Sequence, residues 1–153
     1  MTTSLQAKQD IETRVASWVQ PYADTITKNY RDYHIHTLKG NLSGNYPEYA
    51  REQLDEIENG TANLYKFVVK TGKRYYKIIQ QEFETWEKSK YYGQYRDGSV
   101  HAFVDKKTGQ VYKPASWQAP AKHVRFDLRI IREREFLFNS NNTGWAGGYL
   151  YLR

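Results

Sequence analysis

Apolar positions in the first part of the chain recur with the period of a helix. Between residues 5 and 30 they are Leu5, Ile11, Val15, Trp18, Val19, Tyr22, Ile26 and Tyr30. This spacing is close to 3.6 residues and predicts helix. Pro21 interrupts the run, so we predict two helical segments or a kink there. The Gly-, Asn- and Ser-rich stretch 36–53 begins as a loop, and Pro47 suits the first turn of a second helix, which Gly60 ends.

After residue 60 the pattern changes to that of strands. Two β-rich runs within residues 63–79 flank Thr71-Gly72, which predicts a hairpin. A second hairpin is predicted over residues 99–114. Its first strand alternates Val100, Ala102 and Val104 with Ser99, His101, Phe103 and Asp105. Asp105 can cap its own turn and Gly109 supplies a positive φ, so residues 110–114 return as the partner strand until Pro114 ends it.

The remaining segments are less regular. Residues 82–98 fit either a short helix or an extension of the sheet. Alternation in residues 128–135 places Arg132 and Arg134 on one face of a strand. Tyr149 and Tyr151 alternate with leucines, which predicts a last half-buried strand after a bend at Gly147-Gly148. The sequence as a whole predicts one α+β domain, 1–153, with N-terminal helices packed on or hinged to a mostly antiparallel sheet of about five strands.

Charge and aromatic residues are unevenly distributed between these two parts. The whole chain carries a net charge of +6, but residues 1–60 hold 6 Lys and Arg against 9 Asp and Glu. Residues 61–153 hold 17 against 8, together with 18 of the 24 aromatic residues. The second part is therefore strongly basic and rich in tyrosine, a residue suited to surfaces with one apolar and one wet side.

Cations between aromatic rings indicate single-stranded nucleic acid, because ammonium and guanidinium groups meet phosphates while rings stack on bases. The candidate residues lie in both hairpins, in the segment between them and after the second hairpin. They are Lys70, Lys73, Arg74, Tyr75, Tyr76, Lys77, Tyr91, Tyr92, Arg96, Lys106, Lys107, Tyr112, Lys113, Trp117, Lys122 and Arg125. The alternative is that the rings form core and the lysines protect sheet edges from aggregation. In both hairpins the pattern Lys-Thr-Gly-x-x-Tyr recurs, ending at Tyr75 and Tyr112.

The stretches "SVHAFVDKKTGQVYKPASWQAPAKHVRFDL" and "WAGGYLYLR", preceded by "YYKII", resemble small uncharacterised proteins of tailed bacteriophages, especially cyanophages. The resemblance extends from Tyr75 to Arg153. It implies a phage protein that acts in the host bacterial cytoplasm, or alternatively in the virion, with an accessory or host-modulating role. It implies no catalytic residue.

Metal and catalytic signals are sparse. His34 and His36 would point the same way on a strand and Asp32 could join them, which makes them the candidates for a metal-dependent hydrolase. The chain has no cysteine, no nucleophile elbow and no zinc-protease motif, and the glycines of residues 144–148 are not followed by a P-loop lysine. Residues 1–14 lack the features of a secretory signal. We therefore predict a non-enzymatic protein without a cofactor or a membrane partner.

Two functions remain open at this stage besides the hydrolase. The first is nucleic-acid binding by the basic, aromatic residues. The second is binding to a host protein, either a host factor or a defence system, or a role in the virion; Tyr and Trp would then anchor an interface and the acidic helices would dock.

Overall fold

The computed structural model describes residues 4–152 and confirms the α+β class. In chain order the elements are helix α1 (Ser4–Asn41), helix α2 (Pro47–Asn59), strands β1 (Lys66–Thr71), β2 (Tyr75–Phe83), β3 (Tyr95–Asp105), β4 (Gln110–Tyr112) and β5 (Phe126–Asp127), helix α3 (Ile131–Leu137) and the 3-10 turn η1 (Gly148–Leu150). The five strands form one antiparallel sheet in the order β1-β2-β3-β4-β5, as predicted.

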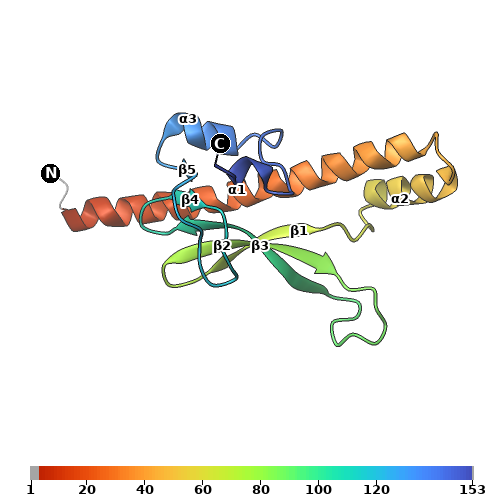
Figure 1. Ribbon diagram of the computed structural model, residues 1–153, viewed down its shortest axis with the longest axis horizontal. Coiled ribbons are helices and arrows are strands. Elements are labelled where there is room, and N and C mark those ends of the chain that lie inside the picture. Colours follow the sequence, from red (N-terminus) through yellow and green to blue (C-terminus); the bar gives the residue numbers. More distant parts are fainter. Residues whose placement is uncertain (1–3, 153) are drawn as a thin grey trace.

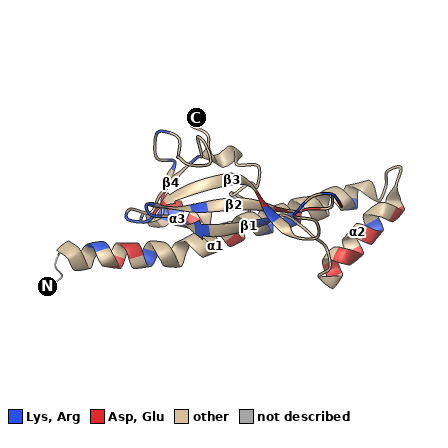
Figure 2. Ribbon diagram, turned by 90° about the horizontal axis from the view of Figure 1, so that it is seen from below, with Lys and Arg blue, Asp and Glu red and all other residues tan. Residues whose placement is uncertain are grey.

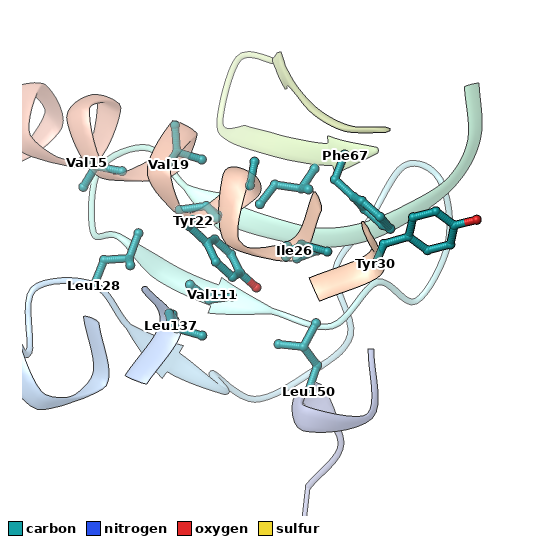
Figure 3. Packing of buried hydrophobic residues seen from close by; sticks show 14 residues of the cluster. Val15, Val19, Tyr22, Ile26, Tyr30, Phe67, Val111, Leu128, Leu137 and Leu150 are labelled. Carbon is teal, nitrogen blue, oxygen red and sulfur yellow. The ribbon is translucent and has the colours of Figure 1, made fainter. Parts of the chain in front are cut away.

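Helix α1 lies along the centre of the molecule. The sheet covers one side of it, while α3 and the C-terminal segment lie on the other side (Figure 1). The main core forms between these layers, where Val15, Tyr22 and Ile26 of α1 are fully buried. Figure 3 shows Tyr22 directed toward Val111 of β4 and Leu137 of α3, while Val15 lies near Leu128. Because both flanks of α1 are covered, most of its middle section is removed from water.

The prediction of two segments around Pro21 is wrong, since α1 continues through this residue as one helix. Pro21 lies on the exposed side, whereas the next two residues, Tyr22 and Ala23, are fully buried. Tertiary packing on both sides of the proline thus maintains a helix that the local sequence disfavours. The helix also runs on to Asn41, into the stretch predicted as loop, because Leu38 packs against α2.

The turn predictions in the middle of the chain are confirmed. β1 and β2 form the first hairpin, with Thr71 opposite Tyr76. The Asp105 carboxylate accepts the backbone N–H groups of Lys107 and Thr108, and Gly109 adopts a φ of 74°. Pro47 begins α2, and Gly60 ends it with a φ of 76°. The first residues of the segment 82–98 belong to β2 and its last residues to β3, and a long turn joins them. The helical alternative is therefore wrong.

Strand β3 does not alternate as predicted. Its pairing with β2 shifts register between Ile78 and Ile79 and again between Gln80 and Gln81, leaving His101 and Gly98 as extra residues. Val100 therefore shares a face with Phe103, while Ala102 and Val104 belong to the opposite face. A bulge changes the direction of a side chain in this way, and here it turns His101 toward the α1 side.

Two C-terminal strand predictions are wrong. Residues 131–137, within the alternating Arg and Glu stretch, form helix α3, and residues 148–150 form the turn η1 rather than a strand. The bend at Gly147 is present, with a φ of 84°. Both elements attach to α1 by polar contacts: the Thr25 hydroxyl donates to the Leu137 carbonyl of α3 (2.9 Å), and the Tyr22 hydroxyl lies 2.6 Å from the Tyr149 hydroxyl of η1. Such long-range contacts leave no periodic signature in the sequence.

A buried polar chain joins three of these layers. The Tyr22 hydroxyl of α1 lies 2.6 Å from the Tyr149 hydroxyl, which lies 2.8 Å from His101 Nε2 of β3. Burial lowers the pKa of His101 to about 4, although a hydrogen bond to the Trp145 backbone opposes this shift. Burial also raises the pKa values of both tyrosines. The imidazole is thus neutral at pH 7, and the Tyr149 hydroxyl donates to it.

Candidate nucleic-acid interface

The sheet surface that faces away from α1 carries a group of aromatic side chains. The Tyr75 ring lies 5.6 Å from the Phe103 ring and 6.3 Å from the Tyr112 ring, both in edge-to-face geometry. Phe103 is fully buried beneath them, whereas Tyr75 and Tyr112 are half-buried. The two tyrosines of the repeated Lys-Thr-Gly-x-x-Tyr pattern therefore meet. Burial raises the pKa of Tyr112, with smaller contributions from Tyr75 and Asp105, so its hydroxyl is neutral. We call this surface the outer face.

Two cations and one tryptophan complete the outer face. The Arg74 guanidinium lies 5.1 Å from the centre of the Tyr75 ring. The Lys77 ammonium lies between the rings of Phe103 and Trp117, at 5.6 and 5.7 Å, and donates to the Trp117 carbonyl. This contact fixes the 113–124 loop against the sheet and leaves 39% of Trp117 exposed. Rings and cations thus form a continuous series from Arg74 to Trp117.

The outer face ends at two adjacent turns. The backbone N–H of Lys106 donates to the Arg74 carbonyl (3.0 Å) and its ammonium to the Gly72 carbonyl (3.1 Å), so the β1–β2 and β3–β4 turns lie side by side. Lys73, Arg74 and Lys107 line a shallow hollow of about 530 Å³ there, with Asp105 and Thr108. We call the group Lys73, Arg74 and Lys107 the basic end; the predicted Lys106 is not part of it, because its ammonium lies on the α1 side of the sheet.

The basic end keeps most of its charge available to a ligand. Asp105 lies 3.5 Å from Arg74 and also caps its own turn, so it orients this guanidinium. Within residues 4–152 no carboxylate pairs with Lys73, Lys106 or Lys107. The sequence indicated Asp105 as a turn cap only; its ion pair with Arg74 depends on how close the two turns lie, which the chain order does not reveal.

Several predicted residues lie elsewhere. Tyr76 points to the α1 side, where Lys106 lies 5.6 Å from the centre of its ring. Lys70 is paired with Asp97, and hydrogen bonds from Lys70 and then Gln81 lower the pKa of that carboxyl. Arg96 is 2.9 Å from Glu84 and 3.8 Å from Glu82. These cations are neutralised by neighbours rather than presented to a ligand.

Tyr91 and Tyr92 lie in the turn between β2 and β3, which projects from the body of the molecule (Figure 1). They are 41% and 53% exposed, and this turn also carries the exposed Trp86. Because β2 is nine residues long, about 3.3 Å of rise per residue puts roughly 26 Å between this turn and Tyr75. The two tyrosines therefore do not share a surface with the outer face.

The last three predicted cations, after β4, are divided as well. The Lys113 ammonium lies 4.6 Å from the centre of the Tyr151 ring. Arg125 donates to the carbonyls of Leu150, Lys122 and His123, which ties the 113–124 loop to the C-terminal segment. Arg125 is thus a structural residue, while Lys122 is exposed.

The metal prediction is wrong in its geometry. His34 and His36 lie on helix α1, where residues two apart point in different directions, rather than on a strand. His34 stacks on Tyr30 at 5.8 Å between ring centres, and burial lowers its pKa. In the described part of the chain no three His, Asp or Glu side chains are grouped as metal ligands would be. Nor is any helix over residues 4–152 apolar along enough of its length to span a membrane.

Acidic and basic groups occupy different ends of the molecule. Helix α2, beside the C-terminal end of α1, bears much of the negative charge, whereas Lys and Arg are prominent on the sheet and its turns (Figure 2). An anionic ligand would therefore be attracted toward the sheet and repelled from α2.

The fold and the surface define an α+β protein with a basic, aromatic outer face. The family model that matches the chain covers residues 1–152, and the chain belongs to this family, described as "Family of unknown function (DUF7717)". No curated protein and no solved structure matches this chain significantly.

Proposed function

We propose that this chain is a non-enzymatic phage accessory protein that binds single-stranded nucleic acid through the outer face and the basic end. The observation that supports this most is the unbroken series of side chains from the basic end through Arg74, Tyr75 and Lys77 to Trp117. The resemblance of residues 75–153 to tailed-phage proteins supports action in the cytoplasm of an infected bacterium.

Each end of this series has a separate role in the proposal. Lys73 and Lys107 meet phosphates and release counterions, which provides affinity without reading sequence. Trp117 and Tyr75 offer partly exposed ring surface on which bases stack; stacking contributes about 1–3 kcal/mol per base. Arg74 lies between the two groups and, with Asp105 beside it, is held in place to contact a phosphate.

A salt series on fluorescent single-stranded DNA and RNA tests the proposal. Three or four phosphate contacts on a single strand predict a slope of about −2 to −3 for log affinity against log salt. Binding that persists unchanged at high salt, or no binding at low salt, would contradict it.

Charge-reversal variants locate the surface. Lys73→Glu with Lys107→Glu should abolish most binding at 100 mM salt. The two substitutions remove both cations from the proposed phosphate site and add two carboxylates that repel the phosphates. Lys39→Glu with Arg51→Glu changes the net charge equally at the α1–α2 end, where both side chains are exposed, and serves as the matched control. Equal losses for the two pairs would show that only overall charge matters.

Trp117→Ala tests the stacking part separately. Removal of the ring should weaken binding by roughly 1–3 kcal/mol while leaving the salt slope unchanged, because no cation is lost. The measurement is the same titration at three salt concentrations. A change in slope without a change in affinity would assign Trp117 a different role.

The acidic end of the molecule favours a second function, binding to a host protein. Tyr46 and Tyr49 are 78% and 61% exposed at the start of α2, beside the carboxylates of Glu48 and Glu52. Exposed tyrosines are common anchors of protein interfaces. A pull-down from host lysate treated with nuclease distinguishes the two: a partner retained after treatment, and lost in Tyr46→Ser with Tyr49→Ser, supports the second function.

A further inference from the structure

A second hollow lies where β4 leaves the sheet. β4 pairs with β3 only at Phe103 and Val104, and the chain turns away at Pro114. The preceding part of β3 therefore has no strand neighbour on this side among the described strands. The C-terminal segment 145–151 borders this gap, and together they line an open cavity of about 400 Å³. This volume is within the range of small-molecule sites.

The wall formed by the C-terminal segment is fixed in position. Tyr149 is held by His101 and Tyr22 through the buried polar chain, and Arg125 Nε donates to the Leu150 carbonyl (2.6 Å). Gly147 turns the chain with a φ of 84°, a value that favours glycine. The cavity is therefore preformed, which lowers the entropy cost of binding.

The lining combines flat rings, one cation and polar groups. Tyr151 and Trp145 supply the rings; the Trp145 ring also packs against Tyr30, Tyr33 and Tyr65, so only part of it can contact a ligand. The half-buried Lys113 supplies the cation, with no carboxylate bound to it in residues 4–152. Ser99 adds a hydroxyl and Gln80 an amide from neighbouring strands; the Gln80 Nε2 donates to Glu82 (3.0 Å), which leaves its carbonyl oxygen for a ligand. Acidic side chains are missing from this lining. The ligand that matches is flat and anionic.

His101 also lines the cavity but takes no chemical part. Its Nε2 accepts from Tyr149, and its other bond, to the Trp145 backbone, occupies the remaining nitrogen. Neither nitrogen is available as an acid or base toward a bound molecule. His101 thus forms part of the cavity wall and does not transfer protons.

We propose that this cavity binds one nucleotide, with the base against the rings of Trp145 and Tyr151 and the phosphate on the Lys113 ammonium. Ser99 and Gln80 then meet the polar edge of the base. A free mononucleotide and one unit of a single strand offer the same chemistry, and only the second case rests on the proposed function. The basic end lies at the two turns, away from this cavity, so the two sites can be tested independently.

Titration of the ¹⁵N-labelled protein with nucleoside monophosphates, followed by NMR, tests the proposal. Saturable shifts are expected at the backbone amides of residues 99–101, 113 and 145–147, and not at Lys73 or Lys107. Absence of shifts in the first group at millimolar nucleotide, for all four bases, would overturn it. Shifts at the basic end alone would show that phosphate binds there and not in the cavity.

Two variants distinguish the phosphate contact from the contacts with the base. Lys113→Gln should weaken a monophosphate at least tenfold and leave the corresponding nucleoside unchanged, because only the phosphate contact is lost. Ser99→Trp, at an exposed strand position, should fill the cavity and abolish both. Lys39→Gln removes a remote lysine as the control. Equal affinities for wild type and both cavity variants would overturn the site.

The outcome distinguishes this inference from the proposed function. If mononucleotides bind in the cavity and oligonucleotides bind no tighter, the cavity is a nucleotide site and the nucleic-acid proposal fails. If oligonucleotides bind with the predicted salt slope and Ser99→Trp has no effect, the nucleic-acid proposal stands and the cavity inference fails. If Ser99→Trp weakens oligonucleotides as well, the cavity holds one unit of the strand.

Discussion

At the scale of single residues, the least expected feature is a histidine in the core. His101 is 8% exposed and lies edge-on to Phe67, with a ring-centre separation of 5.4 Å. The sequence offered only an alternating strand there, which predicts His101 on the opposite face. The bulge reverses its direction, and a bulge depends on the pairing of two distant strands rather than on local preference.

His101 predicts an acid-sensitive fold. Its folded-state pKa is about 4, below the ordinary value of 6.5, so the unfolded chain takes up a proton first as the pH falls. The neutral imidazole contributes about 3 kcal/mol to the free energy of unfolding. This contribution is complete above about pH 6.5 and is lost progressively as the pH falls to about 4.

Urea denaturation between pH 7 and 4 measures this loss. His101→Gln removes the titrating group and should flatten that part of the profile, although it is less stable at pH 7 because the bond from Tyr149 is weakened. His36→Gln, on the exposed side of α1, is the control. Identical pH profiles for wild type and His101→Gln would contradict the assignment.

At the scale of elements, local signals identified those parts that depend on local chemistry. Pro47 and Gly60 delimited α2, and Thr71-Gly72, Asp105 and Gly109 located both hairpins correctly. The errors occur where tertiary packing decides. Helix α1 passes Pro21 because its buried side chains pack on both sides of this residue. Helix α3 and turn η1 replace predicted strands because Thr25 and Tyr22 of α1, distant in the chain, hold them in place.

Pro21 provides a test of this explanation. Proline is about 3 kcal/mol worse than alanine in a helix interior, and its side chain is exposed, so nothing is lost by truncation. Pro21→Ala should therefore raise the free energy of unfolding by about 1–3 kcal/mol in thermal or urea denaturation. Ala16→Gly in the same helix should lower it by about 1 kcal/mol. A destabilised Pro21→Ala would show that the packing requires the proline at this position.

At the scale of the whole molecule, the basic, aromatic composition of residues 61–153 did not reveal how its residues divide. The predicted residues separate into the outer face with its basic end, the cavity near Lys113 and the projecting β2–β3 turn. Composition cannot distinguish these places, because strand length and the direction of each side chain decide them. Neutralised cations such as Lys70 and Arg96 were likewise invisible without their carboxylate partners.

The projecting turn decides which of these places belong to the interface. Glu84 and Gln94 are joined by a backbone hydrogen bond of 2.9 Å, so residues 85–93 can be replaced by Asn-Gly, a two-residue hairpin turn. This removes Trp86, Tyr91 and Tyr92 but none of the main core, so the melting temperature should change by only a few degrees. If the outer face and the basic end bind the strand, oligonucleotide affinity should stay within about twofold, a difference well under 1 kcal/mol. A tenfold loss with an unchanged melting temperature would instead place the nucleic acid along the whole length of β2 and β3, reaching from the basic end to this turn.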